Sequence, residues 1–197
     1  MADYILFWVP SGFDRNDSSR TDFWSRQALL NAAWRMETLQ QEGHSALFSF
    51  PRSVVRDPSK QFVLHNVMMA DVVSFGNINP AAIVIEGTET TGSPSDGLAF
   101  ARLAEKHPNH IIEVFTVSPE MGAYLQVMYS AVAHYMARVN LHMKIYRVYF
   151  GSERHKWVYR ILHAITAIAA GYGPLFCLWY TFLNWLYARR RYGFRQV

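Results

Sequence analysis

The feature that most constrains the fold of this chain is a stretch of 27 residues, 161–187, that contains no Asp, Glu, Lys or Arg. It is rich in Leu, Ile, Phe, Trp and Ala, and a helix of this length and composition is long enough to cross the hydrocarbon core of a bilayer. A buried core helix usually keeps a polar stripe, and none is visible here. The pattern therefore predicts a transmembrane helix over 161–188, which would hold the protein in a membrane by its C-terminal part.

The middle of this segment is predicted to be irregular. Gly171, Gly173 and Pro174 favour a kink at 171–174, because proline lacks a backbone donor and clashes with the preceding turn. A broken pair of half-helices around the same residues is the alternative. Small residues in the first half lie mostly three or four positions apart, a spacing that allows a partner helix to approach closely. Other subunits of a membrane complex are the partners expected from this spacing.

The two parts of the chain differ in charge. Residues 1–120 carry 9 Lys or Arg and 14 Asp or Glu, a net charge of −5, whereas residues 121–197 carry 10 basic residues and one acid, a net charge of +9. The basic residues flank the apolar segment in a juxtamembrane linker, 151–160, and in a tail, 189–197. Those expected to contact anionic lipid headgroups are Arg154, Lys156, Arg160, Arg189, Arg190 and Arg191. Because this charge does not line a groove, no nucleic-acid partner is predicted, and because both flanks are basic the topology stays open.

Residues 1–150 predict one α/β domain with its own core. Apolar strands are expected at 4–10, 46–50, 110–117 and 143–150, and helices at 23–41, 60–70, 94–106 and from Ser118 onward. A third strand in chain order is expected at 71–75 or 81–86, or at both. Strands that alternate with helices predict a Rossmann-like parallel sheet that is covered by helices on both faces.

Ligands of such sheets bind where the strands end at their carboxyl termini. Three polar loops would meet at this edge: 11–22, 77–81 and 87–96. The third loop is long and leads into a helix N-terminus, which favours an anion or a sugar hydroxyl. The residues expected to form a ligand pocket are Asn77, Asn79, Ser95, Asp96 and Gly97.

The order of these segments carries a resemblance. A strand ending in NINP is followed by SDGLAFARLAEKHPNHIIEVF, and residues 4–117 resemble the nucleoside 2-deoxyribosyltransferase family. Gly97, Leu98 and Phe100 fit the family's pattern, and Ser95 or Asp96 stands near its ribose-binding Asp. The resemblance implies that the expected pocket is vestigial.

The same resemblance implies that the chemistry is lost. The family's catalytic Glu would fall at position 101, where this chain has Ala101. That carboxylate attacks the anomeric carbon of the sugar, and alanine has no atom that can do so. Glu86 and Glu89 are candidates to replace it, but no spacing selects either. No catalytic residue is therefore predicted.

The remaining motifs add no further chemistry. The eight His form none of the usual metal-ligand spacings and no phosphate-binding glycine motif is present, so neither a metal nor a cofactor is predicted. We expect a non-catalytic accessory or structural subunit of a multi-subunit membrane complex of the mitochondrial inner membrane, of the respiratory-chain or ATP-synthase type. The alternative is a membrane-anchored enzyme that transfers or hydrolyses glycosyl groups of nucleosides or nucleotides.

Overall fold

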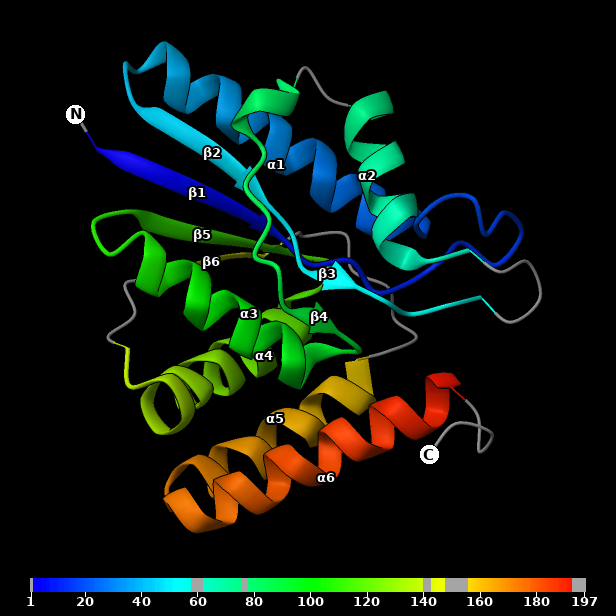
Figure 1. The fold of residues 1–197 in the computed structure, drawn as a ribbon, viewed down its shortest axis with the longest axis vertical. Coiled ribbons are helices and arrows are strands. Elements are labelled where there is room, and N and C mark those ends of the chain that lie inside the picture. Colours follow the sequence, from blue (N-terminus) through cyan, green and yellow to red (C-terminus); the bar gives the residue numbers. More distant parts are fainter. Residues whose placement is uncertain (1, 58–61, 76–77, 140–142, 148–155, 193–197) are drawn as a thin grey trace.

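A computed structural model describes residues 2–57, 62–75, 78–139, 143–147 and 156–192 (Figure 1). Its centre is a four-stranded parallel sheet in the order β2-β1-β5-β6. The strands are β1 (Asp3–Trp8), β2 (Ser45–Ser49), β5 (Ile111–Thr116) and β6 (Met143–Arg147). Helices cover both faces of the sheet, so the α/β class and the parallel, Rossmann-like sheet are confirmed.

Strand β1 shows why the sheet has two cores. Ile5, Leu6, Phe7 and Trp8 are all fully buried or nearly so, as expected for a strand covered on both faces. Because successive side chains point to opposite faces, Ile5 and Phe7 join one apolar cluster and Leu6 and Trp8 join the other.

The first face is covered by α1 (Phe23–Gln41) and α2 (Leu64–Phe75). The Asp22 side chain caps α1 by accepting hydrogen bonds from the backbone amides of Trp24 and Ser25. Across this face, the guanidinium of Arg35 forms two hydrogen bonds, of 3.0 and 3.2 Å, to the carboxylate of Glu113 in β5. Glu113 is fully buried, so this pair fixes α1 to the middle of the sheet.

The second face is covered by α3 (Ser93–Lys106) and α4 (Pro119–Val132), which continues into a π-helical turn, η2 (Ala133–Ala137). The predicted start of α4 is confirmed, because Ser118 caps it by accepting from the backbone amide of Met121. A two-stranded parallel ladder, β3 (Arg52–Ser53) with β4 (Glu89–Thr90), lies beyond the carboxyl end of β2.

Two sequence-based expectations between β2 and α3 are corrected. Residues 71–75 are not a strand but the second half of α2, whose buried Val67, Met68, Asp71 and Val72 have helical spacing. Residues 81–86 form only a single bridge to β2, between Phe48 and Ile83. The first two residues of this range belong instead to the short 3₁₀ helix η1 (Pro80–Ala82), which Asn79 caps.

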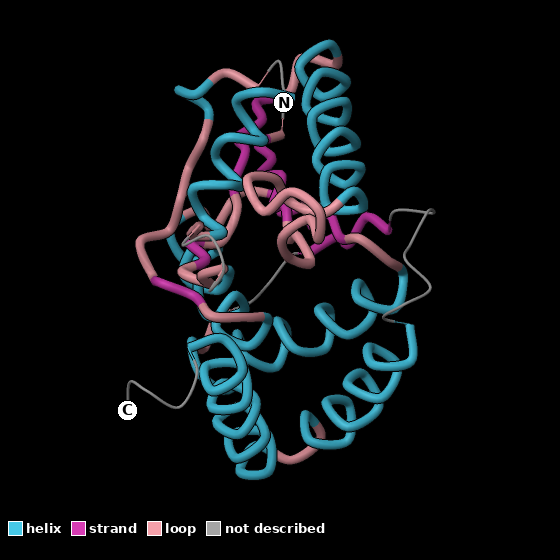
Figure 2. The backbone as a smooth tube through the Cα atoms, turned by 90° about the vertical axis from the view of Figure 1, so that its right-hand side faces the viewer, coloured by secondary structure: helices cyan, strands magenta, loops and turns pink. Residues whose placement is uncertain are grey.

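The predicted single helix over 161–188 is also wrong. The chain forms two helices, α5 (Lys156–Ala170) and α6 (Gly173–Tyr192), which reverse direction at Gly171 and Tyr172. This is the alternative of a broken pair. Figure 2 shows the two helices joined by a short turn at the bottom of the view. None of the described helices combines the length and the hydropathy needed to span a bilayer.

Contacts with the domain explain why the chain turns and does not merely kink. The Tyr135 hydroxyl of η2 donates a 2.8 Å hydrogen bond to the Ala170 carbonyl at the end of α5, which satisfies a terminal carbonyl of that helix. Pro174 stands in the first turn of α6, where no backbone donor is needed. Trp179 of α6 donates to Thr166 of α5 at 2.9 Å and so ties the two helices together.

One face of this hairpin packs against the domain. Thr166, Ala169, Phe176, Tyr180 and Leu183 are buried, and the four other than Thr166 belong to the apolar cluster that contains α3 and α4. They recur three or four residues apart, as expected for one face of each helix. The hairpin is thus the outermost layer on the α4 side of the molecule (Figure 1).

Candidate functional site

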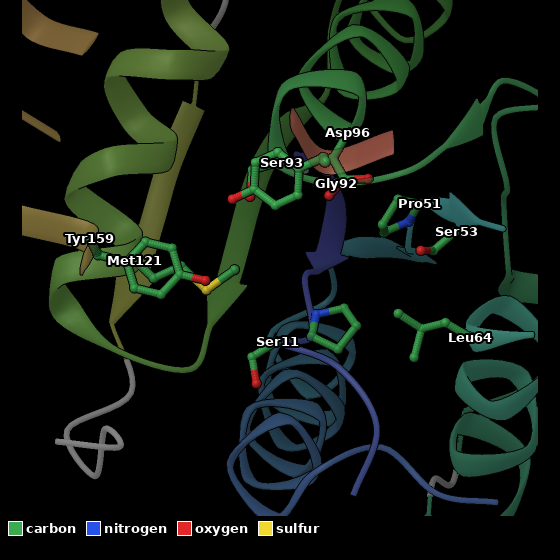
Figure 3. A pocket seen from close by; sticks show the side chains of 11 residues that line it. Ser11, Pro51, Ser53, Leu64, Gly92, Ser93, Asp96, Met121 and Tyr159 are labelled. Carbon is green, nitrogen blue, oxygen red and sulfur yellow. The ribbon is translucent and has the colours of Figure 1, made fainter. Parts of the chain in front are cut away.

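A cavity of about 40 Å³ lies at the carboxyl edge of the sheet, where ligands of parallel sheets bind. Figure 3 shows its lining, which comes from the segments after β1 and β2, from the starts of α2, α3 and α4, and from the hairpin. The lining residues are Pro10, Ser11, Pro51, Ser53, Leu64, Gly92, Ser93, Asp96, Met121, Tyr159 and Tyr187.

Asp96 is the one carboxylate among these lining residues. It stands in the first turn of α3 with only 7% of its surface exposed, where the helix dipole favours its negative charge. Ser93, from the same turn, is also buried and lines the cavity.

Two buried tyrosines lie behind Asp96. Burial raises the pKa of Tyr124 well above its ordinary value, and Tyr187, Tyr159 and Asp96 raise it further. Burial and the Asp96 carboxylate likewise raise the pKa of Tyr129. Both phenols therefore stay protonated at neutral pH. The cavity itself is lined by the Asp96 carboxylate and by serine and tyrosine hydroxyls that can donate to a ligand, which suits a neutral or cationic polar group better than an anion.

Of the described residues that were predicted to form the pocket, Asp96 is the one that lines it. The Ser95 hydroxyl is used by the backbone: it accepts from the amides of Thr91 and Gly92, at 2.9 and 3.3 Å, and donates to the Gly92 carbonyl. Gly97 lies against Tyr129, where an added Cβ would come within 3.0 Å of the ring. Ser95 and Gly97 therefore support the start of α3 and do not line the cavity.

The predicted asparagines do not join this site. Asn79 is exposed and accepts a 2.9 Å hydrogen bond from the amide of Ala81, which caps η1. Because Ile83 pairs with Phe48 in a parallel bridge, the preceding η1 lies toward the amino end of β2, away from the cavity. Asn77 lies outside the described residues. The loops 11–22 and 87–96 meet as expected, and the described part of 77–81 does not join them.

Neither Glu86 nor Glu89, the two candidate carboxylates, lies at the carboxyl-edge cavity. Ala101 is fully buried in α3. Glu86 accepts hydrogen bonds from the Thr88 amide at 2.7 Å and from Lys106 at 3.3 Å. Burial raises its pKa, but Thr88 and Lys106 lower it more, so the net shift is downward. Glu89 lies 3.9 Å from Arg52 in an exposed ion pair, and neither glutamate lines the cavity.

The sequence interpretation missed the contribution of the hairpin to this site. Tyr159 and Tyr187 stand close to the two ends of the apolar segment 161–187, and both line the cavity. Tyr187 packs so closely on Gly92 that a Cβ there would lie 2.5 Å from its ring. In the sequence, the residues that face the domain recur three or four positions apart, from Tyr159 through Thr166 and from Phe176 through Tyr187. The residues between them are also apolar, so this helical spacing does not stand out.

The opposite face of the hairpin is a second candidate site, and we call it the hairpin face. Eleven large apolar side chains of α5, α6 and their turn are exposed on it: Trp157, Val158, Ile161, Ile165, Ile168, Tyr172, Leu175, Leu178, Phe182, Trp185 and Leu186. Trp157, Ile168 and Leu178 each expose more than 70% of their surface. Monomeric soluble proteins rarely expose contiguous apolar patches of this kind.

Three of the basic residues predicted to contact headgroups, Lys156, Arg160 and Arg189, lie at one end of the hairpin. Arg160 near the start of α5 and Arg189 near the end of α6 stack over Trp157 and Trp185, at 5.5 and 4.8 Å from the ring centres. Lys156 begins α5. Arg190 and Arg191 belong to the last turn of α6, with side chains outside the described part, and Arg154 lies outside the described residues. Because the helices are antiparallel, Lys156, Arg160 and Arg189 share one end of the hairpin and do not stand on opposite sides of a bilayer.

A second cavity, of about 220 Å³, lies beside the β3–β4 ladder and is lined by Arg52, Val54, Arg56, Val63, His65, Asn66 and Glu89. Burial lowers the pKa of His65, Arg52 lowers it further, and a hydrogen bond to the Pro51 carbonyl opposes them. His65 is therefore mainly neutral at pH 7. Within the described residues, no cluster of His, Cys, Asp or Glu has the arrangement of a metal site.

These features define an α/β protein with a Rossmann-like sheet, a small carboxyl-edge cavity and an apolar helical hairpin. Comparison with protein-family models, with curated proteins and with solved structures finds no match to this chain.

Proposed function

We propose that this protein is a non-catalytic accessory subunit that is held at a membrane by its C-terminal hairpin and that belongs to a multi-subunit membrane complex. The observation that carries the proposal is the hairpin face. The inner faces of α5 and α6 are already buried against the domain, so the outer apolar residues need a second covering. A helix that is apolar on all sides is stable only when all sides are covered.

The carboxyl-edge cavity supports a non-catalytic role. A volume of about 40 Å³ holds only one or a few water molecules and excludes a nucleoside. Its one lining carboxylate, Asp96, is buried at a helix start, and Ala101 supplies no nucleophile. The mitochondrial inner membrane is the location we propose, because basic residues accompany a moderately apolar segment.

Membrane extraction followed by native electrophoresis tests this function. We expect the wild-type chain to remain with carbonate-washed membranes and, after gentle detergent extraction, to migrate in an assembly much larger than its 22.7 kDa. Mass spectrometry of that band identifies the other subunits. Migration as a free 22.7 kDa chain under the mildest extraction would overturn the accessory role.

An enzyme of nucleoside or nucleotide sugars is the second candidate, and the Asp96 site favours it. A carboxylate beside protonated phenols can bind sugar hydroxyls if Tyr159 and Tyr187 move away from the cavity. The test is incubation of the purified chain with deoxynucleosides and an acceptor base. We expect no transfer or hydrolysis, whereas turnover that Asp96→Asn abolishes would establish the enzyme and refute the non-catalytic proposal.

A further inference from the structure

We infer that the hairpin face lies in the plane of a single lipid leaflet that carries anionic headgroups, so that the protein is embedded in one side of a membrane without crossing it. This inference rests on the proposed function, since it names what covers the hairpin at the membrane. It replaces a spanning helix by an in-plane hairpin, with the α/β domain on the aqueous side.

The direction of the apolar side chains sets the orientation. The inner face of the hairpin packs on the domain through Ala169, Phe176 and Leu183, so the hairpin cannot enter a bilayer end-on without separating from α4. Ile168 and Leu178 point away from the domain and are exposed by 73% and 71%. An amphipathic element of this kind lies in the interface with its apolar face about 5–10 Å deep.

The charges favour lipid as the occupant. The sequence after Glu153 contains no acidic residue, so the charged side chains of the hairpin itself are all basic. Two domain acids face this end: Glu120 of α4 pairs with Arg160 at 3.3 Å, and Asp96 of α3 lines the cavity beside Tyr159 and Tyr187. Basic residues that adjoin an apolar surface are attracted to the anionic phosphates of a leaflet. A protein groove that bound this face would need matching acids at one end of the hairpin.

The tryptophans support the same occupant. Trp157 and Trp185 are exposed beside Arg160 and Arg189, at the basic end of the hairpin face. Tryptophan is enriched where a membrane meets water, because its ring is apolar and its N–H is polar. The aliphatic residues Ile168, Leu175 and Leu178 lie nearer the turn, in a part of the hairpin whose own sequence has no Lys or Arg.

The α1 side of the molecule offers a matched control. Trp34 of α1 exposes 70% of its surface, about as much as the most exposed residues of the hairpin face. It belongs to the helix that covers the opposite face of the sheet (Figure 1). A leaflet that receives the hairpin therefore leaves Trp34 in water.

Vesicle flotation of the purified full-length chain tests the inference. The probes are phosphatidylcholine vesicles with and without about one third phosphatidylserine. We expect the wild type to bind the anionic vesicles. Binding should be at least tenfold weaker for the Ile168→Glu and Leu178→Glu variants, and unchanged for Trp34→Glu. Arg160→Gln and Arg189→Gln should each weaken binding to anionic vesicles about fivefold. Brominated lipids should quench part of the tryptophan fluorescence of the wild type. The quenched part should be missing from a Trp157→Phe, Trp185→Phe double variant and should remain in Trp34→Phe.

The outcomes separate this inference from the proposed function. Circular dichroism of each exposed-site variant confirms its fold, so a loss of binding is a surface effect. Absence of vesicle binding, or equal binding by the glutamate variants and wild type, overturns the lipid inference. If Ile168→Glu then releases the chain from its large assembly on native gels, a protein covers the hairpin face and the accessory role stands. Strong vesicle binding by a chain that always migrates alone keeps the lipid inference and removes the accessory role.

Discussion

Strand β1 and the hairpin are both apolar, but their side chains meet different surroundings. In β1, Ile5 and Leu6 point to opposite faces and both are fully buried, because helices cover each side of the sheet. In α6, Phe176 is fully buried while Leu178, two residues later, exposes 71% of its surface. The hairpin is an outer layer, and nothing in the described chain covers its second face.

The difference teaches that hydropathy measures apolar content and not the number of faces that the same chain covers. A run without charges is expected for a strand between two helix layers. It is also expected for a helix with protein on one side and another apolar environment on the other. Substitutions on the two faces of the hairpin therefore distinguish the face that packs on the domain from the face that needs another apolar environment, which the sequence alone does not.

Removal of Phe176 is expected to have the largest effect on stability. Its ring packs near those of Tyr135 and Tyr180, with centroids 5.6 and 6.3 Å apart. Phe176→Ala leaves a cavity in this cluster and should lower the free energy of unfolding by about 4 kcal/mol. Leu178→Ala, on the exposed face, should change it by less than about 0.5 kcal/mol. Urea denaturation of both variants measures the contrast, and equal small effects would mean that the hairpin does not pack on the domain.

The sequence predicted what is decided locally. The bounds of α1 were predicted at 23–41 and agree with the structure, and Ser118 marks the start of α4, because its capping hydrogen bond involves its own neighbours. The turn at Gly171 and Tyr172 depends on Tyr135, which is 35 residues away from its partner Ala170. Glycines and a proline indicate that a helix is interrupted there, but a kink and a reversal differ only in these distant contacts.

The candidate site divides in the same way. Asp96 was found because a helix start after a long loop marks the carboxyl edge of a sheet. Asn79 was misplaced, since nothing local shows that η1 lies toward the amino end of β2. Tyr159 and Tyr187 could not be assigned to the cavity until the hairpin was known to fold back onto α3.

Breaking the Arg35–Glu113 pair is expected to have the next largest effect on stability. The pair involves the sheet, which helices cover on both faces. Arg35→Met leaves the carboxylate of Glu113, which is fully buried, without its guanidinium partner. Loss of one partner of a buried pair should destabilise the fold by about 3 kcal/mol. Arg20→Met breaks an exposed pair with Asp17, whose side chains are 60% and 51% exposed, and should cost less than about 1 kcal/mol. Similar midpoints for both variants in chemical denaturation would contradict the role of this pair.

Gly92 tests the contact between the hairpin and the core of the α/β domain. The backbone at Gly92 is extended, with φ of 165°, so an alanine there is not strained in itself. Its Cβ would lie 2.5 Å from the Tyr187 ring, and the crowding should cost about 1–2 kcal/mol in Gly92→Ala. In the Tyr187→Ala background the same change should cost almost nothing, and a double-mutant cycle measures this coupling. Additive effects would show that α6 does not close the cavity.

The smallest expected effect concerns His65, beside the second cavity. Burial lowers its pKa from the ordinary 6.5, so at pH values just below 6.5 the unfolded chain binds a proton that the folded chain does not. Stability should therefore fall as the pH drops through 6.5, and level off below the pKa of the folded state. His65→Gln removes this proton and should flatten the decline, while burial of His107, whose pKa is also lowered, leaves a residual slope of the same sign. Urea midpoints of wild type and His65→Gln across this pH range measure the difference. Parallel curves for the two proteins would mean that His65 keeps an ordinary pKa and is solvated in the folded state. The contact between β3 and α2 beside His65 would then be packed more loosely than the two buried faces of β1.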